Sequence, residues 1–135
     1  MRRALKEGSG RSAEYLFVDS ADSVLELVQF KALEFHPRAA TARDPERTDY
    51  IVFDLDPAPD VTWRRVCAAA TLLRDLLADM GLNSFVRTTG GKGLHVVVPL
   101  RPAVALAPAK QFAQAFAASL ASARPAEFIA VASGG

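Results

Sequence analysis

A glycine-rich segment between two β-prone runs constrains the fold of this chain most strongly. Residues 84–88 and 94–100 are rich in β-branched, aromatic and aliphatic side chains, and three of the five residues between them are glycine. Two such runs joined by so short a link pair as an antiparallel hairpin. The link also carries a cation, Lys92. The sequence therefore predicts a sheet that is at least partly antiparallel, with a positively charged turn.

Elements on both sides of this hairpin predict an α/β (α+β) fold. The clearest strand covers residues 50–55, and the prolines that follow it cannot donate hydrogen bonds to a ladder. Apolar residues recur at helical spacing over residues 62–80, and Gly81 follows where a left-handed cap is expected. Residues 15–18 form a short apolar run, which Asp19 or Ser20 ends by capping a following helix. We further expect a strand over 33–35, a loop over 38–49, a helix with Pro108 in its first turn, and the beginning of another strand over 128–132.

The order of these elements predicts one mainly antiparallel sheet with helices on one face. We expect a single partial domain over residues 15–132, after a basic, flexible tail over residues 1–14. Sixteen basic and fifteen acidic side chains leave a net charge of +1, so a large basic field is excluded and any DNA contact is local. Cys67 is the only cysteine, so an internal disulfide is excluded. A single cysteine and the lack of an apolar run long enough to span a membrane favour a cytoplasmic location.

Two aspartates at the end of the 50–55 strand form the first candidate site. Asp54 and Asp56 are two residues apart, so their side chains project from the same face of the strand. Such pairs of carboxylates suit a hard divalent cation. The pattern also resembles the first motif of haloacid-dehalogenase-type phosphatases and the Asp-x-Asp of some glycosyltransferases, and Asp-Pro is a common turn signal. The aspartates alone therefore leave a metal site, a phosphatase motif and a solvated turn open.

The turn of the hairpin forms the second candidate site, a cradle for phosphate. Its glycines let backbone amides approach an anion closely, and a hydroxyl, an ammonium and an imidazole can point at the same oxygens. It is not a Walker loop, because a glycine and a strand follow the lysine. An ordinary hairpin with a solvated lysine and a packed histidine explains the pattern equally well. The residues concerned are Thr89, Gly90, Gly91, Lys92 and His95.

Taken together, the segments EFHPRAATARDPERTDYIVFDLDPAPDVTW and FVRTTGGKGLHVVVPLRP carry two family motifs. One is an Asp-Leu-Asp-Pro after an apolar strand, at residues 54–57, and the other is a Ser/Thr-Gly-Gly-Lys-Gly-x-His hairpin, at residues 89–95. In both, the chain resembles the polymerase domain of bacterial multifunctional DNA ligase D, within the archaeo-eukaryotic primase superfamily. The likeness extends from about residue 15 to residue 128.

The resemblance implies a DNA-end nucleotidyltransferase, a primase-polymerase of bacterial non-homologous end joining that adds nucleotides, commonly ribonucleotides, from NTP or dNTP. Asp54 and Asp56 would bind two Mn²⁺ or Mg²⁺ ions. The cradle residues would hold the triphosphate, and His36, which otherwise reads as a structural histidine before a proline, would line the site. The implied partners are DNA ends with a 5′-phosphate, bacterial Ku, and ligase and nuclease domains.

One departure from the family concerns the metal ligands. The family has a third metal-binding aspartate on a later strand, whereas Glu127 is the only acidic residue after Gly93. Family members are also longer, so we expect an incomplete catalytic core with impaired activity. The alternatives are a non-catalytic remnant that serves as a nucleotide- or DNA-binding module, and a phosphatase with Asp54 as nucleophile and Asp56 as acid/base. Pro57 disfavours the phosphatase, whose motif usually has a small or hydroxyl residue there.

Overall fold

The predicted α+β architecture is confirmed by a computed structural model, which describes residues 2–6, 12–16, 18–32, 35, 39–40 and 44–130. The main sheet has three strands in the order β3-β5-β4, and both pairings are antiparallel. A separate antiparallel hairpin, β1-β2, precedes it. The strands are β1 (Arg2–Lys6), β2 (Ser12–Leu16), β3 (Arg47–Leu55), β4 (Phe85–Thr88) and β5 (Leu94–Ala105).

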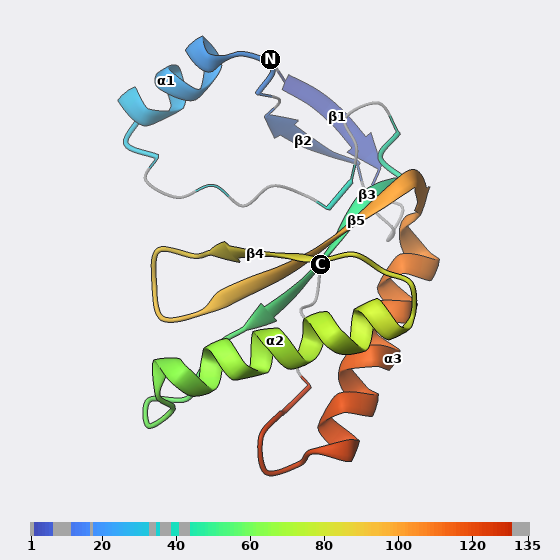
Figure 1. Ribbon diagram of the computed structural model, residues 1–135. Helices are drawn as coiled ribbons and strands as arrows, with labels where there is room; N and C mark the ends of the chain where they lie inside the picture. The colour runs from blue at the N-terminus through green and yellow to red at the C-terminus, as the bar shows by residue number, and fades with distance from the viewer. Residues whose placement is uncertain are drawn as a thin grey trace.

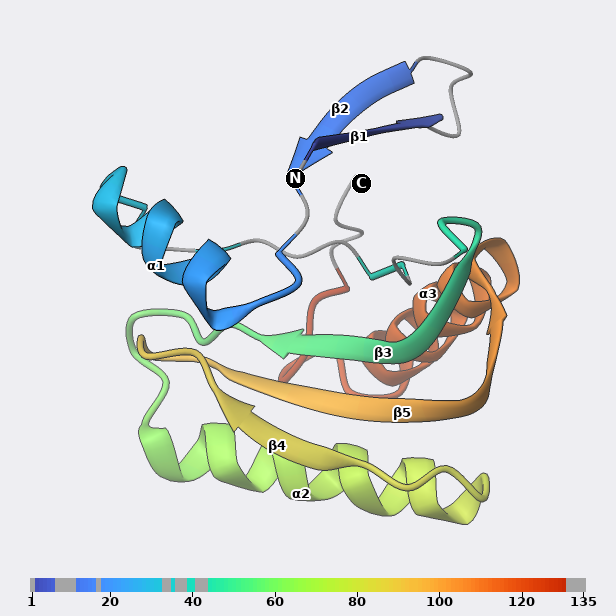
Figure 2. The same ribbon diagram turned by 90° about the horizontal axis from the view of Figure 1, so that it is seen from above.

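Two of the three helices cover one face of the main sheet. Figure 1 shows α2 (Trp63–Asp79) and α3 (Leu106–Ala123) below the sheet, with α1 (Ala21–Gln29) and the β1-β2 hairpin above it. Seen from above, α1 and this hairpin lie beyond the β3 side of the sheet, away from β4 (Figure 2). Within the described ranges, no helix combines the length and apolar character needed to cross a membrane.

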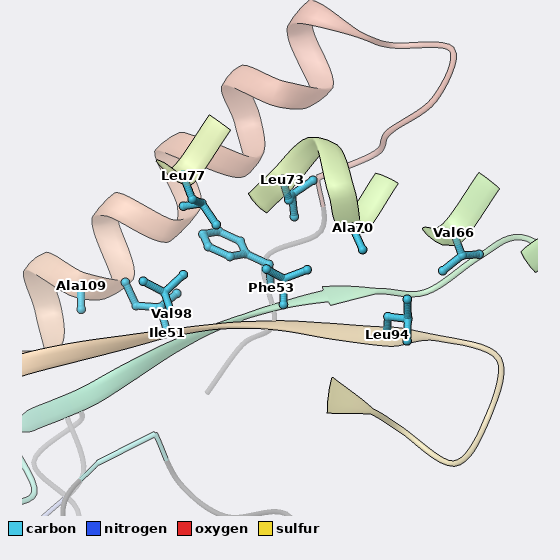
Figure 3. Packing of buried hydrophobic residues seen from close by; sticks show 10 residues of the cluster. Ile51, Phe53, Val66, Ala70, Leu73, Leu77, Leu94, Val98 and Ala109 are labelled. Atoms are coloured by element: carbon cyan, nitrogen blue, oxygen red, sulfur yellow. The ribbon is translucent and has the colours of Figure 1, made fainter. Parts of the chain in front are cut away.

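The hydrophobic core lies between the sheet and the α2–α3 layer, as Figure 3 shows. Side chains of a strand alternate between its faces, so alternate residues over 51–55 of β3 and 94–98 of β5 point at the helices. Phe53 packs against Phe116 of α3 with ring centroids 5.0 Å apart. Leu77 of α2 is fully buried in the same cluster. The other core residues that share this environment are Ile51, Val66, Ala70, Leu73, Leu94, Val96, Val98 and Ala109.

The opposite face of the sheet, which we call the open face, carries the alternate residues of the same strands. Asp54, His95 and Arg87 are cross-strand neighbours there, from β3, β5 and β4 in turn. The next row along the strands is apolar, with Val97 between Val52 and Phe85. One sheet thus separates a buried hydrophobic layer from a polar row by simple alternation.

Local signals account for the helices that were predicted correctly. α2 occupies the predicted 62–80 segment, and Gly81 after it has a φ of +76°. α1 begins after Ser20, whose Oγ accepts a hydrogen bond from the amide of Ser23 at 3.2 Å, as expected of an N-cap. Pro108 lies in the first turn of α3. Residue spacing and caps were therefore sufficient to locate these three helices.

The main sheet extends further than the sequence suggested. β3 begins at Arg47, inside the predicted loop, because Arg47 and Thr48 pair with Ala105 and Val104 at the far end of β5. Thr48 is 1% exposed, and its Oγ1 donates to the carbonyl of Tyr50 at 2.7 Å. β5 continues past Pro99 and Pro102 along a half that pairs with β3 alone. A strand that is paired on one side only needs fewer donors, so it tolerates proline.

The ends of the chain also differ from expectation. Within the stretch predicted as a basic tail, the described residues form β1 and the start of β2, paired from Arg2–Leu16 to Lys6–Ser12. Residues 128–130 are not a strand, and Phe128 packs against the core instead, while the rest of the predicted 128–132 strand lies outside the described residues. Phe35 does not belong to a strand either, and the rest of the predicted 33–35 strand lies outside the described residues.

Candidate functional site

The site is built around a row of three polar side chains across the open face. His95 lies opposite Asp54 of β3 and opposite Arg87 of β4. Its Nε2 is 3.4 Å from Oδ1 of Asp54, and its Nδ1 is 2.7 Å from a terminal guanidinium nitrogen, Nη2, of Arg87. The His95 side chain is 24% exposed and that of Asp54 is 55% exposed. The central strand therefore holds the imidazole between a carboxylate and a cation, with the carboxylate open to solvent.

The second aspartate lies beside the glycine-rich turn. Asp56 follows the last β3–β5 pair, Leu55 with Leu94, and is exposed. A Cβ built on Gly93 would lie 3.1 Å from Oδ1 of Asp56 and 2.8 Å from the carbonyl oxygen of Leu55. Only glycine allows the two strands to approach this closely. The absence of a side chain at Gly93 thus brings the second carboxylate against the base of the turn.

Hydrogen bonds from Thr89 fix the shape of the turn. Its Oγ1 donates to the carbonyl of Gly93 and accepts from the amide of Gly91, both at 3.2 Å. Gly90 adopts a φ of +82°, a conformation that favours glycine. The Thr89 hydroxyl thus holds the turn together in this structure, and Lys92 is exposed within the turn. His36, the remaining predicted site residue, lies outside the described residues.

The two aspartates carry the type of ligand atom, carboxylate oxygen, that a hard divalent cation prefers. They provide carboxylate oxygens at one strand end, and both are exposed. Magnesium sites commonly use only one or two protein carboxylates, because substrate phosphates and water complete the coordination. Among the described residues, no group of three or more His, Cys, Asp or Glu side chains could hold a metal ion. Asp54 and Asp56 would therefore hold a metal together with ligands that the described residues do not supply.

Arg87 is the residue of this row that sequence reasoning left out of the site. It stood in the quoted motif segment but received no role. A usable signal was present, since Arg87 and His95 are each four residues from Gly91, and a hairpin centred on Gly91 places them opposite each other. Symmetry about the turn would have added the guanidinium to the predicted site.

Comparison with known proteins gives one consistent result. The family model described as "LigD, primase-polymerase domain" matches residues 1–134. The multifunctional non-homologous end joining protein LigD of Pseudomonas aeruginosa is 40% identical over 116 residues, which are 86% of this chain and 14% of that protein. Its counterpart in Mycobacterium bovis is 34% identical over 134 residues, covering 93% of this chain and 18% of that protein.

A solved structure extends the likeness to three dimensions. The polymerase domain from Mycobacterium tuberculosis ligase D, in complex with DNA, superposes with a TM-score of 0.80 at 34% sequence identity. The match covers 93% of this chain and 46% of that chain, so this chain spans under half of the solved domain. The resemblance inferred from the two motifs is therefore confirmed. The chain belongs to the LigD primase-polymerase domain family.

Proposed function

We propose that this chain acts in DNA-end nucleotidyl transfer during bacterial non-homologous end joining, as part of a primase-polymerase catalytic core. One observation carries the proposal: Asp54 lies 3.4 Å from His95 while Asp56 lies against the glycine-rich turn. One carboxylate thus lies beside the histidine, and the other lies beside the glycine-rich turn proposed to bind phosphate. Membership of the LigD primase-polymerase family favours nucleotidyl transfer over the phosphatase alternative.

The carboxylates take the role of metal ligands in this proposal. Asp54 and Asp56 would hold Mn²⁺ or Mg²⁺ through their oxygens, and water and phosphate oxygens would fill the remaining positions. Such ions, when bound, stabilise charge on the attacking and leaving oxygens of phosphoryl transfer. Asp54 lies on β3, a strand anchored in the core, and Asp56 follows the last residue of that strand, so the sheet holds the backbone that carries both carboxylates.

The turn and the histidine take the role of the triphosphate site. Lys92 brings an exposed positive charge, and the glycines bring backbone amides that an anion can approach. His95, on the strand that leaves the turn, adds an imidazole next to Asp54. We extend the site to His36, as the family resemblance implies. An NTP or dNTP would thus bind with its phosphates between the turn and the two carboxylates.

DNA ends are the proposed second substrate. The related mycobacterial polymerase domain was solved in complex with DNA, which supports DNA binding by this family. The net charge of +1 implies a few local phosphate contacts here, and no broad basic surface. A 5′-phosphate at the end, bacterial Ku, fused ligase and nuclease domains and a cytoplasmic location complete the proposal.

The number of carboxylates supports a second candidate function. The described residues offer two aspartates at the site, and the only later acidic residue, Glu127, forms an ion pair with Arg124 at 3.6 Å after α3. Charge neutralisation by two carboxylates is weaker than by three, so we expect slow extension by this chain alone. A nucleotide-binding module that binds Mn²⁺ and NTP without polymerising is the alternative.

Primer extension separates the two candidates. The full chain is mixed with Mn²⁺, a labelled NTP and a DNA end carrying a 5′-phosphate, and the added nucleotides are resolved on a gel. We expect slow extension that Asp54→Ala and Asp56→Ala each reduce by at least about 100-fold. Asp60→Asn is the matched control, because this exposed aspartate lies in the turn after β3, outside the site. Mn²⁺-dependent NTP binding without extension would select the binding module, and no NTP binding would reject both.

A further inference from the structure

We propose that Arg87 is a positioning residue that fixes the tautomer of His95 and so aims the Nε2–H of the imidazole at the triphosphate. This assignment rests on the proposed nucleotide-binding function and adds a residue to it. The geometry that carries it is the 2.7 Å contact between Nη2 of Arg87 and Nδ1 of His95. The two residues are directly opposite each other in the β4–β5 ladder, so the contact is built into the strand register.

The chemistry of the two groups determines which atom donates. A guanidinium has only N–H donors and no acceptor, and it stays protonated in proteins. Nδ1 of His95 must therefore accept the hydrogen bond through its lone pair. An imidazole that accepts at Nδ1 carries its proton on Nε2. The Arg87 contact thus selects the Nε2–H tautomer and holds the plane of the ring.

The opposite side of the ring shows what this tautomer can do. Nε2 lies 3.4 Å from Oδ1 of Asp54, which is beyond the usual length of an N–H···O hydrogen bond. At this distance the carboxylate does not engage the Nε2–H in a hydrogen bond of normal length, so we infer that the Nε2–H can donate to an oxygen of a phosphate bound next to Asp54. Because Nε2 carries a proton and Nδ1 is occupied by Arg87, His95 has no free lone pair for a metal. His95 then donates a hydrogen bond to phosphate, and it does not replace a third carboxylate as a metal ligand.

The first test reads the tautomer directly and needs no activity. The chain has two histidines, so a ¹⁵N spectrum of the imidazoles at mildly alkaline pH is simple, and His95→Gln identifies the His95 signals. We expect a protonated Nε2 and a hydrogen-bonded, unprotonated Nδ1. Arg87→Met removes the donor, so Nδ1 should shift to the position of a free lone pair, and Arg87→Lys, which keeps a donor, should restore the wild-type signal. An unchanged Nδ1 in Arg87→Met overturns the proposal.

The second test asks whether Arg87 acts through His95 or by its own charge. Binding of Mn²⁺–ATP to the full chain is measured for Arg87→Met, His95→Gln and the double variant. We expect Arg87→Met to weaken binding about tenfold, because a misoriented imidazole loses one hydrogen bond to a charged phosphate. In the His95→Gln background, the same change should have less than about a twofold effect, because the group it orients is gone. An equal tenfold loss in both backgrounds contradicts the positioning role.

A matched control separates this contact from the general loss of a cation. Arg74 lies on α2, away from the open face, and pairs with Asp75 at 2.7 Å. Arg74→Met should leave both the His95 spectrum and Mn²⁺–ATP binding unchanged. If the wild-type chain does not bind Mn²⁺–ATP, the proposed function fails, while the ¹⁵N spectra still decide whether Arg87 sets the His95 tautomer.

Discussion

The two faces of the β3-β5-β4 sheet differ sharply although they alternate along the same strands. Phe53 on the helix-covered face is 8% exposed and packs against Phe116, whereas the next residue, Asp54, faces the open side with a side chain that is 55% exposed. On β5, Val96 is fully buried while its neighbour His95 contacts Asp54 and Arg87. Along these strands, one residue packs in the core and the next contributes to the candidate site. Substitutions at adjacent positions should therefore affect either the stability of the fold or the activity of the site.

The largest expected effect comes from the adjacent pair Phe53 and Asp54. Phe53→Ala should lower the free energy of unfolding by about 3–5 kcal/mol, since it removes a buried ring and leaves a cavity beside Phe116. Asp54→Asn should change it by less than about 0.5 kcal/mol, because the side chain is largely exposed. Urea unfolding followed by circular dichroism measures both. A similar loss of stability in the two variants would contradict the view that the helix-covered face stabilises the fold more than the open face does.

The second prediction concerns two adjacent valines of β5 and tests whether the open face also contributes to stability. Val96 is fully buried against the helices, and Val97 is 6% exposed on the open face between Val52 and Phe85. Val96→Ala should cost about 2–3 kcal/mol and Val97→Ala about 1 kcal/mol. The smaller loss is expected because Phe85 is 54% exposed, so its side chain is free to move into the gap. Equal losses in urea unfolding would mean that the open face is packed as tightly as the core.

The third prediction tests the close approach of the turn to β3. Gly93→Ala places a Cβ 2.8 Å from the backbone oxygen of Leu55, which cannot move without breaking the ladder, so we expect a loss of about 1–3 kcal/mol. Gly91→Ala is the control, because its Cβ would lie 3.7 Å from Oγ1 of Thr89, an ordinary contact. Its effect should stay within about 0.5 kcal/mol. Thermal unfolding compares the two, and a tolerated Gly93→Ala would contradict the tight strand approach.

The smallest expected effect concerns the hydroxyl that holds the turn. Thr89→Val keeps the shape of the side chain but removes the hydrogen bonds to Gly91 and Gly93, which should cost about 1 kcal/mol. Exchange of the Gly91 amide with solvent should accelerate while core amides of β5 exchange as before. Thr89→Ser restores the hydroxyl and should restore protection. Unchanged exchange in Thr89→Val would show that the glycines alone shape the turn.

The features that sequence alone predicted depend on local rules. The α2 periodicity with Gly81 behind it, and the strand–glycine–strand hairpin, need only residue spacing and turn chemistry. The start of β3 was missed because Arg47 and Thr48 become a strand through pairing with residues near 105, which no local pattern indicates. The role of β1 and β2 as a hairpin was missed for a similar reason, since a basic, glycine-containing stretch also fits a tail.

The candidate site divides in the same way. The types and order of Asp54, Asp56 and the glycine-rich turn can be read from the sequence, but their distances follow from the β3–β5 register. Arg87 was left out because its proposed role depends on His95, which lies opposite it in the β4–β5 ladder. A motif read along the sequence does not show which residues are paired across strands. The metal and nucleotide roles of these residues remain predictions for the experiments above.

The alternation of the two faces also bears on errors during folding. If β3 paired with β5 one residue out of step, Asp54 would turn toward α2 and α3 while Phe53 turned to water. Such a misregistered chain would bury a carboxylate in an apolar layer and lose the contact between Phe53 and Phe116, so it would be too unstable to accumulate. A stably folded molecule therefore presents Asp54 and His95 on the same side of the sheet. The packing that stabilises the fold also selects the strand register that the site needs.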